Sequence, residues 1–346
     1  MLVKFAKQLH RSLVLLLSLS FPVFAAAETD FYKGKTLNII VSTDAGTGYD
    51  IYARTIARHW TNHIPGNPNI VVQNMTGAGG LRTANLLYNV TAKDGLTLGL
   101  VQSTVPFEPF FGNKSASFDA MKFNWIGTPS QEVLTVIVWH TVPVRTLEDA
   151  QKRGLTLAAT GGASTPAFYA RVLGSLLQIP IKLIAGYKSQ NDVFLGMERG
   201  ENDGSPATFY STLKVNKPDW LAEKKAIPLL QYGGAPDPEI PNVPFVMNLL
   251  KTADDREAME IASAPLQVGR PLVAPPGVDP ERIKLLRASL EKTFKDPAYL
   301  ADCAKQMIAC DSALSGEAIA DILKRTYSAK KHVRDRLVEI YERRED

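Results

Sequence analysis

The sequence has little of the chemistry that most enzymes and metalloproteins need. Its 346 residues include only two cysteines and five histidines. It has no Gly-x-Ser-x-Gly element, no His-Glu-x-x-His, no Cys-x-x-Cys and no phosphate-binding P-loop. Gly46-Thr47-Gly48 begins like a dinucleotide-binding element, but Ile51 stands where that element has its third glycine. We therefore expect no catalytic residue, no cofactor and no bound metal.

The few histidines and cysteines favour structural roles. His59 and His63 are four residues apart, so one helix face would carry both. No acidic or cysteine residue stands beside them in the sequence, which favours a solvated helix end over a metal site. Cys303 and Cys310 form either a disulfide, if the compartment is oxidising, or two buried thiols. Their spacing leaves both readings open.

Long apolar runs are scarce too, except at the N-terminus. Lys4, Lys7 and Arg11 precede an apolar stretch over 13–24, and Ala25-Ala26-Ala27 follows it. A basic start, a short apolar run and small residues are typical of a secretory signal peptide, and the run is too short to span a bilayer comfortably. We predict that residues 1–27 are a signal peptide cleaved after about Ala27, so that the mature protein is exported.

A strong net charge is also lacking in the rest of the chain. The predicted signal peptide holds three of the 39 Lys and Arg residues and none of the 35 Asp and Glu residues, so the remaining net charge is +1. No run of lysines and arginines occurs there. Because nucleic-acid binding leaves a basic footprint, we expect no nucleic-acid partner.

What the mature chain does contain is an alternation of strand and helix patterns. At this length two domains are the default expectation. Apolar strand patterns are often followed by a glycine-rich turn and a helix pattern, which predicts parallel strands with helical crossovers. The predicted strands are 37–42, 70–73, 96–101, 133–139, 155–159, 181–184, 229–232 and 271–274. The predicted helices start near 49 and 206, or span 166–177, 190–199, 280–295 and 315–344, with one ending near 89.

The pattern restarts after about residue 139, which predicts two similar α/β lobes. We expect lobe 1 to comprise 28–129 plus 270–346, and lobe 2 to comprise the inserted residues 130–269. Each lobe would be a mostly parallel sheet flanked by helices. The chain would then cross between the lobes twice, near 127–132 and 268–271, which would form a hinge beside a cleft.

Four loops rich in glycine, serine or threonine each precede a predicted helix. A helix N-terminus offers unpaired N–H groups and a positive dipole end, so it binds anions without a lysine. In parallel sheets such loops gather at the carboxyl ends of the strands, where ligands bind. Glycine in such loops also serves the turn itself, but four together favour a small carboxylate ligand. The loops are Asp44–Asp50, Thr76–Gly80, Thr160–Thr165 and Asp203–Pro206.

Seven segments follow the order and spacing of one family. They are Leu37–Asp50 (LNIIVSTDAGTGYD), Val72–Gly80 (VQNMTGAGG), Asp94–Leu100 (DGLTLGL), Leu157–Thr165 (LAATGGAST), Ala185–Ser189 (AGYKS), Gly200–Gly204 (GENDG) and Leu272–Val278 (LVAPPGV). Over nearly all of the mature chain the sequence resembles the substrate-binding proteins of tripartite tricarboxylate transporters, also called Bug receptors.

The resemblance implies a type II-like, two-lobed periplasmic binding protein. Such a protein is a monomer that captures a small organic or aromatic carboxylate between its lobes, partly through waters, and delivers it to an inner-membrane permease. It performs no catalysis. Two other functions stay open from the sequence: a carboxylate receptor for a sensor kinase, and, less favoured, a periplasmic enzyme acting on organic acids.

Carried over by position, the resemblance also implies a set of ligand-binding residues. The first loop would supply Thr43, Asp44, Gly48, Tyr49 and Asp50. Thr76, Gly77, Ala78 and Gly79 would support it, with Ser103 or Thr104 after the third strand. Lobe 2 would supply Thr160, Gly162, Ala163, Ser164, Thr165, Tyr187 and Asp203.

The sequence departs from the family pattern at two positions. Asp44 adds an acid where a carboxylate is expected, so it either selects a ligand with hydroxyls or a cation, or points away and caps the helix. Arg270 stands where an aromatic residue is common, so it either forks onto a carboxylate or lies on the surface. Several aromatic residues lie near the predicted loops, where they would stack an aromatic acid or pack in the core: Tyr49, Phe107, Phe168, Tyr187 and Phe209.

Overall fold

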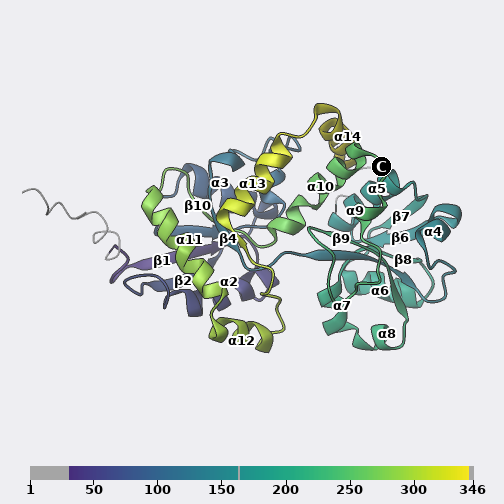
Figure 1. Ribbon diagram of the computed structural model, residues 1–346, viewed down its shortest axis with the longest axis horizontal. Coiled ribbons are helices and arrows are strands. Elements are labelled where there is room, and N and C mark those ends of the chain that lie inside the picture. Colours follow the sequence, from purple (N-terminus) through teal and green to yellow (C-terminus); the bar gives the residue numbers. More distant parts are fainter. Residues whose placement is uncertain (1–30, 163, 343–346) are drawn as a thin grey trace, which may run out of the picture.

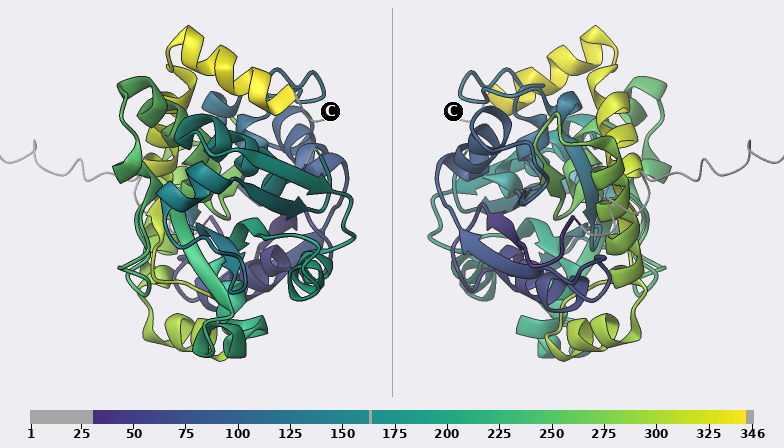
Figure 2. Two further views of the ribbon diagram at one scale, coloured as in Figure 1. Left: turned by 90° about the vertical axis from the view of Figure 1, so that its right-hand side faces the viewer. Right: turned by 90° about the vertical axis from the view of Figure 1, so that its left-hand side faces the viewer.

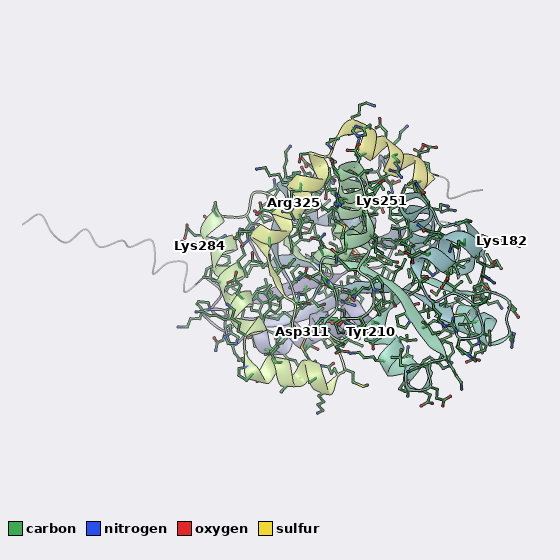
Figure 3. All side chains as sticks on the ribbon, turned by 45° about the vertical axis from the view of Figure 1, so that its right-hand side comes forward. Lys182, Tyr210, Lys251, Lys284, Asp311 and Arg325 are labelled. Carbon is green, nitrogen blue, oxygen red and sulfur yellow. A yellow bond between two sulfur atoms is a disulfide. The ribbon has the colours of Figure 1, made fainter. Side chains whose placement is uncertain are left out.

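The computed structural model describes residues 31–162 and 164–342, whose strands form two separate sheets (Figure 1). The predicted signal peptide lies outside the described residues. No helix among the described residues is long and apolar enough to cross a membrane. Lys284 of α11 and Lys182 of β7 lie on opposite sides of the molecule (Figure 3).

The first sheet has the strand order β11-β4-β10-β3-β1-β2. Strand β1 is parallel to β2 and β3, whereas β10 runs antiparallel to β3 and β4. Leu37, Ile39 and Val41 of β1 are fully buried, because helices cover both faces of this part of the sheet. The strands are β1 (Thr36–Val41), β2 (Asn69–Asn74), β3 (Thr97–Leu100), β4 (Asn124–Thr128), β10 (Leu272–Ala274) and β11 (Leu314–Ser315).

Helices with one apolar face pack on this sheet. In α2 the buried residues include Tyr52, Ile56 and Trp60, spaced at four residues. The Trp60 Nε1 donates a hydrogen bond to Ser289 Oγ of α11 at 2.8 Å. The elements that accompany this sheet in sequence are α2 (Gly48–Trp60), η1 (Ala78–Gly80), α3 (Leu81–Asn89), η2 (Val105–Phe107), η3 (Ala120–Lys122), α11 (Pro280–Phe294), α12 (Pro297–Lys305) and α13 (Gly316–Tyr327).

The second sheet has the order β7-β6-β8-β5-β9. Strands β6, β7 and β8 are parallel, and β5 runs antiparallel to β8 and β9. Its strands are β5 (Val133–Trp139), β6 (Leu155–Ala159), β7 (Ile181–Ala185), β8 (Gly204–Phe209) and β9 (Ala226–Gly233). Its helices are α4 (Leu147–Arg153), α5 (Thr165–Leu177), α6 (Gln190–Glu198), α7 (Tyr210–Asn216), α8 (Pro218–Ala222), α9 (Val246–Leu249) and α10 (Ala253–Val268).

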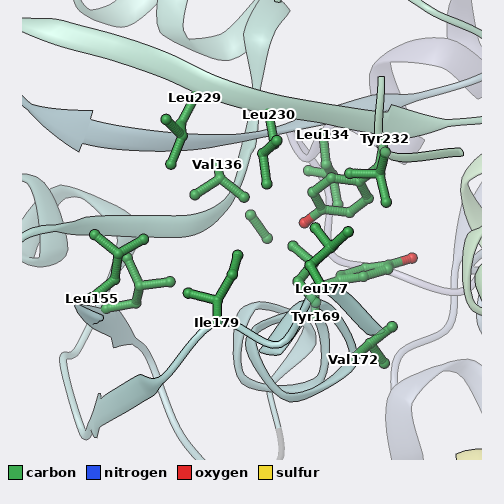
Figure 4. Close-up of a cluster of buried hydrophobic side chains, with 14 of the residues drawn as sticks. Leu134, Val136, Leu155, Tyr169, Val172, Leu177, Ile179, Leu229, Leu230 and Tyr232 are labelled. Atoms are coloured by element: carbon green, nitrogen blue, oxygen red, sulfur yellow. The ribbon is translucent and has the colours of Figure 1, made fainter. Parts of the chain in front are cut away.

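The core beside this sheet contains Tyr169 and Tyr232 (Figure 4). The hydroxyl of each donates a hydrogen bond to a backbone carbonyl. Tyr169 donates to Ala262 O and Tyr232 donates to Pro206 O, both at 2.8 Å. Their ring centroids are 4.8 Å apart. Burial raises the pKa of both tyrosines, so both stay neutral donors that join α5 and β9 to α10 and β8.

These two mixed sheets with flanking helices confirm the predicted α/β class, but two predicted helices are wrong. The helix expected near Pro206 is strand β8, which lies between β6 and β5. Its pairing with β5 shifts register at Pro206, where a residue without an N–H is tolerated. A Cβ at Gly204 would lie 2.0 Å from Ile137 O, so glycine permits the close approach of these strands. Residues 204–209 therefore form a strand because of their tertiary contacts and not because of their own sequence pattern.

The helix expected over 315–344 is two helices. It breaks at Ser328, and α14 (Lys331–Glu342) continues in a new direction after α13. Figure 2 shows this last helix across the top of the molecule from both sides. Val333, Leu337 and Ile340 of α14 lie in the hydrophobic cluster of the second sheet, against α5 and α10. The division into lobes stays a prediction, and α14 packs with the part predicted as lobe 2.

Two adjacent segments connect the sheets. One joins β4 to β5 and the other joins α10 to β10. Gly269 has φ +62°, and a Cβ there would lie 1.9 Å from Ser130 O. The two connections therefore touch through backbone atoms, at a position that only glycine fits.

Cys303 and Cys310 form a disulfide, with Cα atoms 6.3 Å apart. Both cysteines are buried in the cluster of the first sheet. The bond closes the turn after α12, where Ala309 O accepts a hydrogen bond from the Tyr52 hydroxyl at 2.6 Å. The reading as two free thiols is thereby excluded.

Reduction of this disulfide should lower the unfolding free energy by about 2 kcal/mol, because the closed loop is short. Urea unfolding of the mature protein with and without reductant measures the difference. In a Cys303→Ala/Cys310→Ala variant the reductant should have no effect. If the variant responds to reductant as the unchanged protein does, the bond is not the cause.

Candidate functional site

A cavity of about 540 Å³ lies where loops from both sheets meet. This volume is within the range of small-molecule sites. Both sheets supply its walls, together with the end of α10 and the last helix. The lining residues are Tyr49, Gln102, Ser103, Thr104, Phe107, Glu108, Phe111, Leu134, Ser164, Thr165, Pro166, Phe168, Tyr169, Gln190, Ala207, Thr208, Phe209, Pro265, Leu266 and Tyr341.

Several of these residues follow the carboxyl ends of parallel strands. Ser103 and Thr104 follow β3, Ser164 and Thr165 follow β6, and Gln190 follows β7. The carboxyl ends of parallel strands share one edge of a sheet, where open α/β folds bind ligands. The cavity therefore occupies the position that the topology predicts for a ligand.

The polar part of the lining carries hydroxyls and a helix N-terminus but no cation. Ser164 is the N-cap of α5, and its Oγ donates to Gly161 O at 2.6 Å and accepts from the Ala167 amide at 3.4 Å. Among the described lining residues there is no Lys, Arg or His, and Glu108 is the one charged side chain. An anion here would rely on hydroxyls and the α5 dipole.

The apolar part of the lining is aromatic. Phe111 stacks on Tyr341 with ring centroids 4.6 Å apart and planes 11° apart. Phe168 meets both rings edge-on, at 6.2 Å from Phe111 and 6.1 Å from Tyr341. These three side chains come from the segment after η2, from α5 and from α14. Together they form a surface suited to a flat or apolar ligand body.

Tyr49 links the cavity to the connection between the sheets. Its hydroxyl accepts a hydrogen bond from the Ser103 amide at 3.0 Å and donates to Gly269 O at 3.3 Å. One lining residue of α2 thus holds the loop after β3 against the segment that leaves α10.

The first predicted loop is held by Asp50 and does not reach the cavity beyond Tyr49. The Asp50 carboxylate accepts hydrogen bonds from Arg54 Nε at 3.0 Å, the Gly46 amide at 2.9 Å and Asn74 Nδ2 at 3.0 Å. The Arg54 hydrogen bond, followed by those from Gly46 and Asn74, lowers the pKa of Asp50 from 3.8 to about 2. Asp50 is buried with its acceptors satisfied, so it shapes the loop.

Asp44 and its neighbours lie outside the cavity lining. Asp44 is exposed and does not cap α2, whose N-cap is Thr47. Thr43 Oγ1 lies 2.7 Å from Thr47 Oγ1, within the loop itself. Gly48 is exposed. Thr76 and Gly77 precede η1, Ala78 and Gly79 belong to it, and all four are exposed and lie outside the cavity lining.

The predicted residues of the second lobe divide in the same way. Ser164 and Thr165 line the cavity, whereas Thr160 and Gly162 stand just before them without lining it, and Ala163 lies outside the described residues. Tyr187 also stands apart, with its hydroxyl donating to Glu201 Oε2 at 3.3 Å.

Asp203 lies at the amino end of β8, away from the loops that meet at the cavity. It accepts hydrogen bonds from Arg153 at 2.8 and 3.1 Å and from the Thr156 amide at 2.8 Å. Burial alone would raise the pKa of Asp203, but these hydrogen bonds outweigh burial and lower it. The helix expected after Asp203 is wrong, because residue 204 starts a strand, and Asp203 does not line the cavity.

Arg270 is occupied within the protein. It forms an ion pair with Glu132, and its Nη1 donates to Ser130 Oγ at 3.1 Å. Its guanidinium carbon lies 4.3 Å from the Tyr52 ring centroid. The side chain is 17% exposed, so it is not a free surface group. Arg270 ties the two connections between the sheets together and does not line the cavity.

Sequence reasoning found part of the lining and missed the rest. Tyr49, Ser103, Thr104, Ser164 and Thr165 were expected as ligand residues and do line the cavity. The aromatic expectations Phe107, Phe168 and Phe209 line it as well. The missed residues are Gln102, Glu108, Phe111, Leu134, Pro166, Tyr169, Gln190, Ala207, Thr208, Pro265, Leu266 and Tyr341.

Gln190 could have been predicted, because the loops between a parallel strand and the next helix were already expected to bind the ligand. Gln190 begins a helix after a parallel strand, as Thr165 does. Ala207 and Thr208 were missed because a helix was expected near Pro206, where the structure has strand β8. Nothing in the sequence pattern brings Tyr341 of the last helix to residues near 108.

The two spaced histidines bind separate carboxylates. His59 Nε2 lies 3.0 Å from Asp302 Oδ2, and His63 Nε2 lies 2.8 Å from Asp296 Oδ2. Both aspartates belong to the segment of α12, so the histidines join α2 to α12. Among the described residues no group of three or more His, Cys, Asp or Glu side chains is placed to hold a metal.

Solved structures share this fold. A TctC solute-binding protein from Polaromonas, crystallised without ligand, is 17% identical, with a TM-score of 0.70 over 89% of this chain and 99% of that one. The periplasmic binding protein BugD is 18% identical, with a TM-score of 0.59 over 90% and 98%. MatC from Rhodopseudomonas palustris with bound malate is 18% identical, with a TM-score of 0.56 over 93% and 100%.

At these identities the similarity shows the fold. No protein-family model and no curated protein matches the chain. The chain therefore has the two-lobed fold of periplasmic binding proteins, with the cavity where the topology predicts it.

Replacing Asp50 by Asn should destabilise the protein by about 2 kcal/mol at pH 7, because the shift of its pKa from 3.8 to about 2 measures that preference for the charged form. Since the pKa is lowered in the folded state, this stabilisation is present above about pH 4 and is lost as the pH falls toward 2. Thermal unfolding at several pH values measures it.

Asp44→Asn is the matched control, because Asp44 is an exposed acid in the same loop. It should leave the melting temperature nearly unchanged. Equal effects of the two substitutions at pH 7, or an Asp50→Asn effect that grows below pH 4, would contradict the role given to Asp50.

Proposed function

We propose that this chain is a periplasmic receptor of the tripartite tricarboxylate transporter type. It binds a small carboxylate in the cavity between its two halves and delivers it to an inner-membrane permease. It acts as a monomer and leaves the ligand chemically unchanged. The cavity at the carboxyl ends of the parallel strands carries this proposal, because its described lining residues include groups that can bind an anion and no recognised catalytic set.

The carboxylate would bind at the N-terminus of α5. The first N–H groups of an α-helix have no partner inside the helix, and the dipole adds a partial positive charge there. The hydroxyls of Ser103, Thr104 and Thr165 add donors around the same space. This arrangement binds one carboxylate without a lysine or arginine, so the ligand is released without breaking a salt bridge.

The structurally similar proteins support this function, together with features of the chain itself. The Polaromonas structure is described as a solute-binding protein, BugD as a periplasmic binding protein, and MatC was solved with malate. The predicted signal peptide and the disulfide favour an exported protein, since disulfides persist in oxidising compartments. The permease partner rests on the resemblance of the sequence motifs.

Ligand binding would change the relative position of the two halves. The connections at 129–132 and 269–271 are the segments that such a motion would bend. Tyr49 touches both the cavity and Gly269, so a ligand that fills the cavity contacts a residue fixed to the hinge. A ligand with higher affinity for the closed form shifts the population toward it.

A small carboxylate that binds should raise the melting temperature of residues 28–346 by several degrees. At a hundred to a thousand times its dissociation constant a ligand adds about 3–4 kcal/mol of apparent stability. Thermal unfolding with a panel of aliphatic and aromatic mono-, di- and tricarboxylates measures this. A panel without any shift would contradict the proposed function, and chemical conversion of a bound acid would establish an enzyme instead.

The hydroxyls of the cavity provide the matched test of the site. For a carboxylate that gives a shift, a Thr104→Val/Thr165→Val variant should bind about ten times more weakly in calorimetry, because two donors are lost. Thr76→Val, an exposed threonine outside the lining, is the control and should keep full affinity. Equal affinities for the two variants would place the site elsewhere.

The same ligand should make the protein more compact in solution. X-ray scattering of the mature protein with and without it should show a smaller radius of gyration when it is bound. An unchanged radius with a ligand that demonstrably binds would contradict closure about the two connections.

A further inference from the structure

Glu108 is the feature of the cavity that a general carboxylate site does not explain. It is the one charged side chain among the described lining residues. Its Oε2 accepts hydrogen bonds from Asn113 Nδ2 at 2.8 Å and from the Tyr341 hydroxyl at 3.3 Å. Two partners from different parts of the chain thus hold this carboxylate beside the stacked rings of Phe111 and Tyr341.

We propose that the cavity selects an aromatic monocarboxylate whose far end carries no negative charge. This rests on the proposed function and specifies its ligand. The ligand carboxylate binds at the start of α5, and its ring lies on the surface formed by Phe111, Phe168 and Tyr341. Glu108 rejects a second carboxylate on the ring, and it accepts a hydrogen bond from a ligand hydroxyl.

The charges of the lining argue for one carboxylate and against two. A helix N-terminus supplies about half a positive charge, and the described lining adds no cation to it. A dicarboxylate would bring two negative charges into a partly desolvated space that already holds Glu108. Like charges brought together without a compensating cation are destabilising. The second carboxylate of such a ligand would therefore be repelled by Glu108, with no cation among the described lining residues to compensate.

The aromatic side chains argue for a ring in the ligand. A short aliphatic diacid such as malate has no face to lie on these rings, and its two ends are both charged. Phe107 and Phe209 add further apolar lining. The cavity volume of about 540 Å³ leaves room for a substituted phenyl group with a short acidic chain.

Among the described residues, hydrogen bonds from protein donors reach Oε2 of Glu108 and not Oε1. Oε1 is therefore an acceptor for a donor on the ligand. A para-hydroxyl on the ring supplies that donor, whereas a para-carboxylate supplies only acceptors and a charge. The two substituents occupy the same ring position, but the hydroxyl should strengthen binding beside Glu108 and the carboxylate should weaken it. They therefore form a matched pair of probes.

Calorimetry of the mature protein with three related acids tests the proposal. The probes are 3-phenylpropanoate, its para-hydroxyl derivative and its para-carboxylate derivative. We expect the first two to bind at least ten times more tightly than the third. In a Glu108→Gln variant, which keeps the acceptor oxygen but removes the charge, this preference should fall below about threefold.

Glu201→Gln is the matched control. Glu201 also accepts a tyrosine hydroxyl, that of Tyr187 at 3.3 Å, but it does not line the cavity. The control should keep the tenfold preference. A second pair, Tyr341→Leu against Tyr187→Leu, tests the ring surface: the first should weaken 3-phenylpropanoate binding about tenfold without weakening hexanoate, and the second should weaken neither. Melting temperatures of all variants show that they fold.

The outcomes separate this inference from the proposed function. If the unchanged protein binds the para-carboxylate derivative, malate or adipate as tightly as 3-phenylpropanoate, the selectivity inference is wrong and the receptor function stands. If the preference exists but Glu108→Gln leaves it at tenfold, Glu108 is not its cause. If no carboxylate of either class binds, both the receptor function and the inference fail.

Discussion

The architecture depends on the contact between the two connections that join the sheets. Gly269 lies against the backbone of Ser130, and Arg270 reaches back to Glu132 and Ser130 across the same contact. Because the connections are adjacent, the two sheets are held with the loops of one facing the loops of the other. This contact helps to bring the carboxyl ends of parallel strands from both sheets to the place where the cavity lies.

The chemistry of the cavity follows from which groups those loops can offer. Parallel strands followed by helices present helix N-termini, so an anion finds donors without any cation in the wall. The other walls come from elements outside this scheme: the segment after η2 and the last helix supply the rings and the acid. In the proposed function, residues from these other elements give selectivity to a site whose first side suits any carboxylate.

The sequence was informative where the local pattern and the tertiary structure agree. Strands β5 and β6 have the predicted bounds, since Val133–Trp139 and Leu155–Ala159 are apolar runs that a buried strand requires. Segment 204–209 was misassigned because Gly-Ser-Pro-Ala-Thr-Phe carries no strand signal and is placed by its neighbours. The aspartates show the same limit. Asp50 and Asp203 have the residue type of ligand contacts, but hydrogen bonds from Arg54 and Arg153 occupy them.

The position of the last helix has a mechanical consequence. Helix α13 packs on β4 of the first sheet and α14 packs on α5 of the second, with only Ser328–Lys330 between them. This short link is a third connection between the halves, and it is distant in the sequence from the other two. Tyr341 of α14 in turn contacts Phe111 and Glu108 of the segment after η2, so any movement of one half relative to the other would have to change these contacts.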